Sequence, residues 1–183
     1  MHRDKGIRNL SCYLKLLEAN NYANRFDIEG NNLARRMAEE ALVMCPGSSS
    51  AYNLLGITYM MDYWLGSGKS PQESIEKAIE LAQKAIALDD AYAQPRGLLS
   101  FLYSIKREHE KAVTEGERAV ALDPNGADVH VWYAISLNFA GKPGEAIPLF
   151  QKAIRLNPFG PTWYFFNLGN ALLITNRPDE AVS

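Results

Sequence analysis

The residues that could act in catalysis are scattered along the sequence and form no complete active-site motif. His109 and Glu110 begin like the HExxH helix of zinc enzymes, in which two histidines one turn apart bind the metal. Val113 stands in the place of the second histidine, so the ligand pair is incomplete. Glu115 and Glu117 lie on different faces of a helix and do not form a carboxylate pair for acid–base chemistry. We therefore expect His109 to lie in a solvent-exposed turn between two helices.

Other kinds of site are also missing from the sequence. It contains no GxxxxGKS/T, GxGxxG or GxSxG segment, so neither a phosphate-binding loop nor a nucleophile elbow is indicated. Cys12 and Cys45 do not form a CxxC motif and have no histidine nearby, which argues against a metal site and a disulfide framework. We expect both to be buried as small apolar side chains. The sequence predicts a protein that is not an enzyme and that uses no metal ion or cofactor.

The composition is that of an ordinary folded protein. Of the 183 residues, 47% are apolar and 22% are charged, and the formal net charge is −2. Lys and Arg are interspersed with Asp and Glu, so no basic surface is available for nucleic acid. The apolar stretches are shorter than the roughly 18 residues of a membrane span, and the N-terminal segment lacks the continuous apolar core of a secretion signal. We expect a cytoplasmic protein that binds neither nucleic acids nor membranes.

Alanine recurs along the chain at regular intervals. Ala78, Ala112 and Ala146 are equally spaced, with a period of roughly 34 residues, and Ala181 stands one residue beyond the next period. A second alanine follows each of the first three after seven residues, at Ala85, Ala119 and Ala153. Apolar residues between these alanines recur at three and four positions, as in an amphipathic helix. This pattern predicts a repeated pair of helices that stacks on its neighbours.

One copy of the repeat is longer than the others. The distance from the start of the first apolar group to the alanine of the second helix is 13 residues for Leu99 to Ala112 and 23 residues for Leu55 to Ala78. We therefore expect ten inserted residues between the two helices of this copy.

The inserted segment, MMDYWLGSGK, carries Tyr63 and Trp64 beside two glycines. Two roles remain open for it: a flexible connection whose aromatic rings contact a partner, or a lid that buries them on the neighbouring hairpin. The following Ser70-Pro-Gln-Glu73 is a capping box with proline in the first turn, so a helix is expected to begin sharply after the insertion.

These features resemble the tetratricopeptide repeat (TPR) family. A helix–turn–helix of about 34 residues with a Leu-Gly-x-x-Tyr group, an Ala-x-x-x-Phe pair and a terminal proline is typical of that family. Leu55-Gly56-x-x-Tyr59 matches the first half, and Ala146-x-x-x-Phe150 followed by Pro158 matches the second. Three positions depart from the pattern: Gly116 replaces a large residue, His130 stands where Trp or Leu is usual, and Asp90 replaces a proline.

The resemblance implies an all-α fold, a right-handed α-solenoid of antiparallel helix pairs (a TPR superhelix) with about four and a half repeats. We expect a single array over residues 1–183. Its parts are a degenerate first repeat (7–46), the repeat with the insertion (49–90), two regular repeats (93–124 and 127–158) and an incomplete last repeat (161–183). Because the sequence stops one turn into the last second helix, we expect that the natural protein continues or that this end docks on another chain.

In TPR proteins the first helices line a concave groove that binds an extended peptide or a helix. By this resemblance, the groove combines apolar, aromatic and Met side chains with a few amides. Its predicted lining is Asn53, Ile57, Met60, Met61, Gln94, Phe101, Ile105, Asp128, Val131, Ile135, Asn138, Phe139, Trp163, Phe166, Asn167 and Asn170. Trp132, Tyr133 and Tyr164 are expected in the core instead. The convergent Lys and Arg residues with which chaperone-tail binders hold a C-terminal carboxylate are absent from this lining.

The resemblance implies a non-catalytic interaction module whose partner is a protein or peptide segment with apolar side chains. The stretch from Gly68 to Ile147 is also similar to the C-terminal TPR region of bacterial signalling proteins with a class III nucleotide cyclase domain. That likeness implies the regulatory region of a larger signalling protein, although no cyclase residues occur in this sequence. The alternative is self-association: a homo-oligomeric scaffold that assembles through its incomplete C-terminal hairpin.

Overall fold

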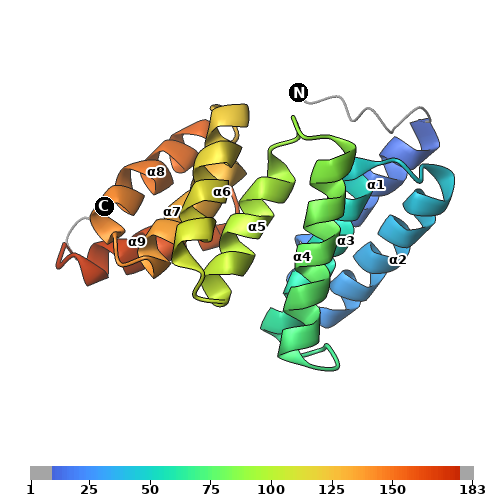
Figure 1. Ribbon diagram of the computed structural model, residues 1–183, viewed down its shortest axis with the longest axis horizontal. Coiled ribbons are helices and arrows are strands. Elements are labelled where there is room, and N and C mark those ends of the chain that lie inside the picture. The colour runs from blue at the N-terminus through green and yellow to red at the C-terminus, as the bar shows by residue number, and fades with distance from the viewer. Residues whose placement is uncertain (1–9, 178–183) are drawn as a thin grey trace. The chain divides into compact units, whose positions relative to one another are not determined.

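The computed structural model describes residues 10–177, and over this range the regular secondary structure is all helical, with no β-strand (Figure 1). This confirms the predicted all-α fold. The helices are α1 (Leu10–Ala23), α2 (Ile28–Met44), α3 (Ser49–Leu65), α4 (Pro71–Leu88), α5 (Gln94–Ile105), α6 (His109–Leu122), α7 (Ala127–Phe139), α8 (Pro143–Leu156) and α9 (Thr162–Ile174). Ala181, and with it the second helix predicted for the last repeat, lies outside the described residues. None of the described helices is long and apolar enough to cross a membrane.

The chain divides into two compact units, Met1–Leu98 and Leu99–Ser183, so the boundary falls inside α5. In the first unit, each of the helices α1 to α4 packs on the next, and α1 also contacts α3. In the second unit, α6 to α9 pack in the same sequential way, and α7 also contacts α9. Contact between first helices of successive pairs is what stacking of helical hairpins produces. The repeat ranges given above remain a prediction.

Alanines bring the helices of each unit close together. The side chains that recur with the period of the repeat are fully buried: Ala78, Ala85, Ala112, Ala119, Ala146 and Ala153. A methyl group at these positions leaves room for larger neighbours, such as the fully buried ring of Phe150 in α8. Cys12 and Cys45 are also buried, as predicted, and the Cys12 thiol lies 3.8 Å from the carbonyl oxygen of Ala41.

The ten inserted residues lengthen two helices and add little to the connection between them. Helices α3 and α4 have 17 and 18 residues, whereas α7 and α8 have 13 and 14. Gly66 ends α3 in the left-handed conformation, with φ of 62°. The Ser70 hydroxyl accepts a hydrogen bond from the backbone N–H of Glu73 at the start of α4, which is the expected cap. The interpretation of the insertion as a flexible connection, one of the two left open, is therefore wrong for most of its length.

The aromatic residues of the insertion belong to α3. The rings of Tyr63 and Trp64 meet edge to face with centroids 5.7 Å apart. Trp64 is 58% exposed, which contradicts the interpretation of its ring as part of a buried lid. Contact of Trp64 with a partner stays a prediction.

Packing explains why Gly116 departs from the repeat pattern. A Cβ atom at Gly116 would lie 2.5 Å from Cδ2 of Tyr133 and 2.9 Å from Oγ of Ser100. The Tyr133 ring therefore occupies the space that the large residue of the usual pattern would fill. Burial, together with the nearby Glu117 carboxylate, raises the pKa of Tyr133 to about 12.

His130, which departs from the repeat pattern, is buried, and only one of its two ring nitrogens has a hydrogen-bond partner in the described chain. His130 is 1% exposed, and its Nε2 lies 2.9 Å from the carbonyl oxygen of Pro124. Its Nδ1 is buried without a hydrogen-bond partner in the described part of the chain. Burial lowers the pKa of His130 below the ordinary 6.5, although the Pro124 carbonyl acts in the opposite direction.

We expect His130 to make the second unit less stable in mild acid. Because its pKa is lower in the folded chain than in the unfolded chain, the unfolded state binds the proton more readily. The stabilising effect of a neutral His130 is therefore complete above the unfolded pKa of roughly 6.5 and is lost as the pH falls toward the folded value. Urea unfolding at about pH 7.5 and about pH 5.5 should show a smaller acid loss in His130→Gln than in the wild type. Equal acid losses in the two proteins would contradict this assignment.

Candidate functional site

Six of the residues predicted to line a groove are buried. They are Asn53, Met60, Met61, Phe101, Val131 and Ile135, each 5% exposed or less. The prediction that they line an open groove is therefore wrong. The physical reason is the packing of the first helices, since α3 contacts α1, α2 and α4, and α7 contacts α6, α8 and α9. A side chain one turn from a packing position on such a helix is still covered.

The other predicted groove residues reach the surface to different extents. Phe139 is 49% exposed and Phe166 is 68% exposed. Asp128 is also exposed, and the remaining members are half-buried: Ile57, Gln94, Ile105, Asn138, Trp163, Asn167 and Asn170. Most of these accessible residues lie in the second unit.

Three aromatic rings, one from each first helix of the second unit, form a row. Phe101 of α5 contacts Trp132 of α7, with ring centroids 5.1 Å apart and planes tilted by 49°. Trp132 in turn contacts Trp163 of α9 at 5.1 Å, with a tilt of 35°. We call these three residues the aromatic row. Phe101 is buried at one end, whereas the two indoles are partly exposed.

The row corrects one expectation for the core. Tyr164 is buried, as predicted, and its ring meets Trp163 edge to face at 4.7 Å. Trp132 was also expected in the core, yet it remains partly exposed. Phe101, Trp132 and Trp163 follow one another at equal intervals in the sequence.

The two indoles of the row have unused hydrogen-bond donors. Within residues 10–177, neither the N–H of Trp132 nor that of Trp163 donates to an acceptor of the chain. Neither nitrogen is among the buried polar atoms that lack a partner, so both N–H groups reach solvent. An indole N–H can donate a hydrogen bond but cannot accept one.

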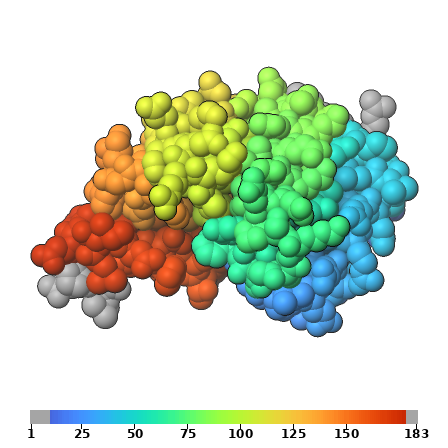
Figure 2. All heavy atoms as spheres, turned by 60° about the horizontal axis from the view of Figure 1, so that its bottom comes forward, coloured from blue at the N-terminus to red at the C-terminus, as the bar shows by residue number. Residues whose placement is uncertain are grey.

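Helix α9 continues the accessible surface beyond its tryptophan. Trp163, Phe166, Asn167 and Asn170 follow at intervals of three and four residues and so share one side of the helix. The Asn167 amide donates to the carbonyl oxygen of Trp163 at 2.7 Å, while the Asn170 side chain makes no hydrogen bond to another described residue. Figure 2 shows the red atoms of α9 at the surface of the second unit.

We call one set of accessible side chains on α7 and α9 the aromatic face. It comprises Trp132, Phe139, Trp163, Phe166, Asn167 and Asn170.

The first helices of the second unit are almost without charge. Residues 99–105, 127–139 and 162–174 include a single charged side chain, that of Asp128. Its Oδ1 accepts a hydrogen bond from the hydroxyl of Tyr164, and burial raises the pKa of that hydroxyl far above its usual range. Although Asp128 as a residue is exposed, its carboxyl group loses water beside Tyr164, which raises its pKa as well. The aromatic face therefore offers ring surface and amides but no ionic contact.

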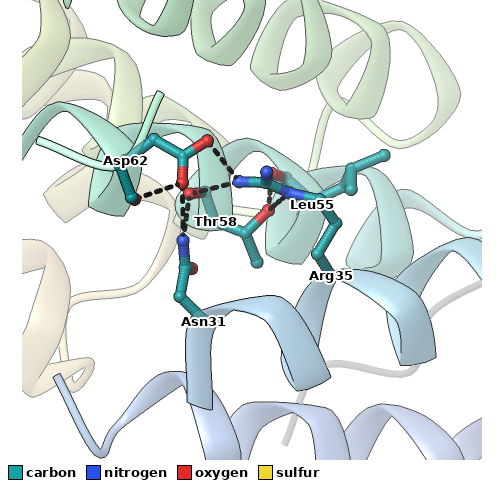
Figure 3. A network of polar contacts seen from close by, with 6 residues as sticks. Asn31, Arg35, Leu55, Thr58 and Asp62 are labelled. Atoms are coloured by element: carbon teal, nitrogen blue, oxygen red, sulfur yellow. Dashed lines mark hydrogen bonds and ion pairs between the residues drawn. The ribbon is translucent and has the colours of Figure 1, made fainter. Parts of the chain in front are cut away.

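A buried polar network joins α2 to α3 in the first unit, and no pattern in the sequence predicted it (Figure 3). Arg35 Nη2 lies 2.7 Å from Asp62 Oδ2 and donates to the carbonyl oxygen of Thr58 at 2.8 Å. Asn31 Nδ2 donates to Asp62 Oδ1 at 2.9 Å, and the Ser67 hydroxyl donates to the same oxygen at 2.9 Å. Both carboxylate oxygens of Asp62 are thus engaged within the protein, and the network connects α2 to α3.

The arginine of this network also stacks on a ring. The guanidinium carbon of Arg35 lies 4.3 Å from the centroid of Tyr59, a cation–π contact. Asp62 belongs to the ten inserted residues, so lengthening α3 is what brings this carboxylate to α2. In the described residues, no group of three or more His, Cys, Asp or Glu side chains is placed to hold a metal ion.

Part of the sequence matches a known family of repeats. The tetratricopeptide repeat family model matches residues 102–161 and residues 134–183. No curated protein matches the sequence. The match covers less than half of the chain and supports the interpretation of that part as tetratricopeptide repeats, while the likeness to cyclase-type signalling proteins stays a prediction.

Solved structures share the fold over most of the chain. TTC0263, a thermophilic TPR protein in Thermus thermophilus, is 20% identical with a TM-score of 0.64, and the match covers 78% of this chain and 73% of that one. Pseudomonas aeruginosa pilF is 19% identical with a TM-score of 0.64, over 93% of this chain and 72% of that one. YrrB, described as a TPR protein with an unusual peptide-binding site, is 18% identical with a TM-score of 0.51, over 91% and 79%. At these identities the likeness shows the fold.

Proposed function

We propose that this chain, whose helices have the fold of TPR proteins, is a non-catalytic interaction module that binds a protein segment on its aromatic face. The observation that supports this proposal is the partly exposed aromatic row, continued by the exposed rings of Phe139 and Phe166. Large uncharged aromatic side chains gathered on one surface are typical of protein contacts. Asn170 adds an amide that can bond to the backbone of a bound peptide.

The partner of this surface is a segment with apolar side chains. Burying one such side chain contributes about 1.5–3 kcal/mol, and the face offers no charged group that would select an acidic or basic segment. The peptide-binding site named for YrrB supports a peptide as the kind of partner, although it is said of that protein.

Replacing the exposed rings of the aromatic face should weaken peptide binding without unfolding the chain. Phe139→Ser and Phe166→Ser each remove a ring that is largely outside the core, and we expect each to lower the affinity about tenfold. Phe159→Ser is the matched control, since Phe159 is 98% exposed and lies in the turn before α9. Calorimetric titration with uncharged synthetic peptides, one proline-rich and one helical, measures the affinities. Equal affinities in all three variants, or no binding of any apolar peptide, would refute the proposal.

We propose self-association as a second candidate function, because the first and the last described helices expose apolar side chains. On α9, Phe165, Leu173 and Ile174 are 48%, 61% and 67% exposed. On α1, Leu10, Leu14 and Leu17 recur along one side and are 71%, 53% and 46% exposed. In a scaffold, α9 of one copy would pack on α1 of the next. Light scattering that gives the mass of a single chain throughout the micromolar range would eliminate this candidate.

We also propose that the module acts in the cytoplasm as the regulatory region of a larger signalling protein, as the likeness of its sequence to cyclase-type proteins implies. The complete gene sequence tests this proposal, which requires an output domain in the same protein.

A further inference from the structure

We infer that Asn125 is a site of spontaneous deamidation and that its main product, isoaspartate, weakens the start of α7. The inference goes beyond the proposed function, because it concerns a covalent change in the turn between α6 and α7 and involves no bound partner. Three features lead to it: the glycine that follows Asn125, the exposure of this turn, and the buried histidine that the turn holds.

Deamidation of an asparagine followed by glycine needs no enzyme, metal or oxidant. The backbone nitrogen of Gly126 loses its proton to hydroxide and attacks the side-chain carbonyl carbon of Asn125, where a C–N bond forms and the amide group leaves as ammonia with a proton from water. The reacting groups belong to adjacent residues, so the five-membered succinimide ring closes within the chain. Water then opens the ring at one of its two carbonyls, which gives aspartate or isoaspartate. In isoaspartate the main chain runs through the former side chain, so the backbone gains one methylene group and an α-carboxylate is left free.

Asn125 is the only asparagine of the sequence that is followed by glycine. A side chain on the next residue crowds the attacking nitrogen, and glycine has none. Asn125 is also exposed, and it lies in the turn between α6 and α7. Packing keeps the glycine in place, because a Cβ atom at Gly126 would overlap Oδ2 of Asp123. Asn24 is likewise exposed in a turn, but Arg25 follows it, so Asn24 should react far more slowly.

The attacking nitrogen is held by a backbone hydrogen bond of the turn. The N–H of Gly126 donates to the carbonyl oxygen of Asp123 at 3.1 Å. Gly126 is the N-cap of α7, and no side-chain hydrogen bond caps this helix in the described chain. Breaking the bond therefore opens the turn while the hydrogen bonds inside α7 stay intact. We expect the folded chain to react, though more slowly than a free peptide of the same sequence.

The product should disturb a buried histidine. The carbonyl oxygen of Pro124, next to Asn125, lies 2.9 Å from Nε2 of His130, whose other ring nitrogen has no partner in the described chain. One extra methylene group between Pro124 and α7 displaces that carbonyl relative to the ring, and a buried nitrogen that loses its partner lowers the stability. The new carboxylate is favoured by the dipole of α7 and repelled by the nearby Asp123, so its charge should have little net effect. The longer backbone should therefore be what destabilises the second unit.

The first test ages the full chain at physiological temperature, at neutral and at mildly alkaline pH. Isoaspartyl methyltransferase, which transfers a methyl group from S-adenosylmethionine to the free α-carboxylate, labels the product, and peptide mapping by mass spectrometry locates it. We expect the label to accumulate at Asn125, and faster at the higher pH, because hydroxide removes the amide proton. Asn125→Gln is the matched variant: its longer side chain would have to close a six-membered ring, so nearly all of the label should be lost. Asn24 is the internal control, and the synthetic peptide ALDPNGADVH, residues 121–130, gives the rate without the fold.

The second test compares the urea unfolding of aged and fresh samples. We expect a lower urea midpoint for the second unit in the aged wild type. Aged Asn125→Gln should stay near the fresh wild type, because it forms no isoaspartate. Fresh Asn125→Asp should also stay near it, since this variant has the new charge on a backbone of normal length.

Three results would contradict the inference. If the peptide is labelled but the folded chain is not, the turn protects Asn125 and the inference is overturned. Equal labelling of Asn24 and Asn125 would overturn the role of the following glycine. If Asn125 is labelled and the urea midpoint stays unchanged, or if Asn125→Asp lowers it as much as ageing does, the weakening of α7 by a longer backbone is overturned.

Discussion

Asp62→Ala is expected to destabilise the first unit by about 3 kcal/mol, because it leaves Arg35 partly buried without its counter-ion. The Asp62 side chain is 6% exposed and that of Arg35 is 20% exposed. The same substitution removes the acceptors of Asn31 and Ser67, which adds to the loss.

Hydrogen exchange of the backbone amides in α2 and α3 measures this effect in the first unit directly. Glu80→Ala is the control, since the Lys77–Glu80 ion pair lies on the surface, with side chains 42% and 66% exposed. Removing a surface pair of this kind should change stability by less than about 1 kcal/mol. The double variant Arg35→Met with Asp62→Leu should recover much of the loss, because an apolar pair needs no counter-ion. If Asp62→Ala costs no more than Glu80→Ala, the network does not stabilise the unit.

Gly116→Ala is expected to destabilise the second unit by about 2 kcal/mol, although alanine is the better helix former. The new Cβ would meet the Tyr133 ring at 2.5 Å, and overpacking of this kind costs up to about 3 kcal/mol. About 1 kcal/mol of that cost is offset by the higher helix propensity of alanine.

Gly169→Ala provides the comparison for this prediction. No atom lies within 4 Å of a Cβ placed at Gly169, which is inside α9 of the same unit. This variant should gain about 1 kcal/mol from helix propensity alone. Urea unfolding followed by circular dichroism measures both variants. A stabilised Gly116→Ala would show that the Tyr133 ring moves aside without cost.

The helices could be predicted because the residues that mark them lie close together in the sequence. The alanines that recur once per repeat mark buried contacts, and Ser70 with Glu73 marks the start of α4. The insertion was misread because its glycines suggested a loop. Most of its residues, up to Leu65, in fact continue α3, and only the segment 66–70 connects the two helices. Composition alone does not tell a lengthened helix from a longer connection.

The candidate site was predictable only in part, because exposure depends on packing between helices that are distant in sequence. Phe139 and Phe166 are exposed, whereas Phe101 and Ile135 are buried, although all four were predicted to line one groove. The contact between Arg35 and Asp62 joins residues 27 apart and follows no helical period. The equal intervals between the members of the aromatic row were present in the sequence but have no meaning until α7 and α9 are seen to pack together.

The positions of the two thiols allow cysteine labelling to measure transient opening of the first unit. Cys12 is fully buried and Cys45 is 5% exposed, both in the first unit, and the sequence of the second unit contains no cysteine. Alkylation of either sulfur requires that its surroundings open, so the labelling rate follows transient opening of the first unit alone. A ligand that binds only to the second unit should therefore leave this rate unchanged, whereas coupling between the units would slow it.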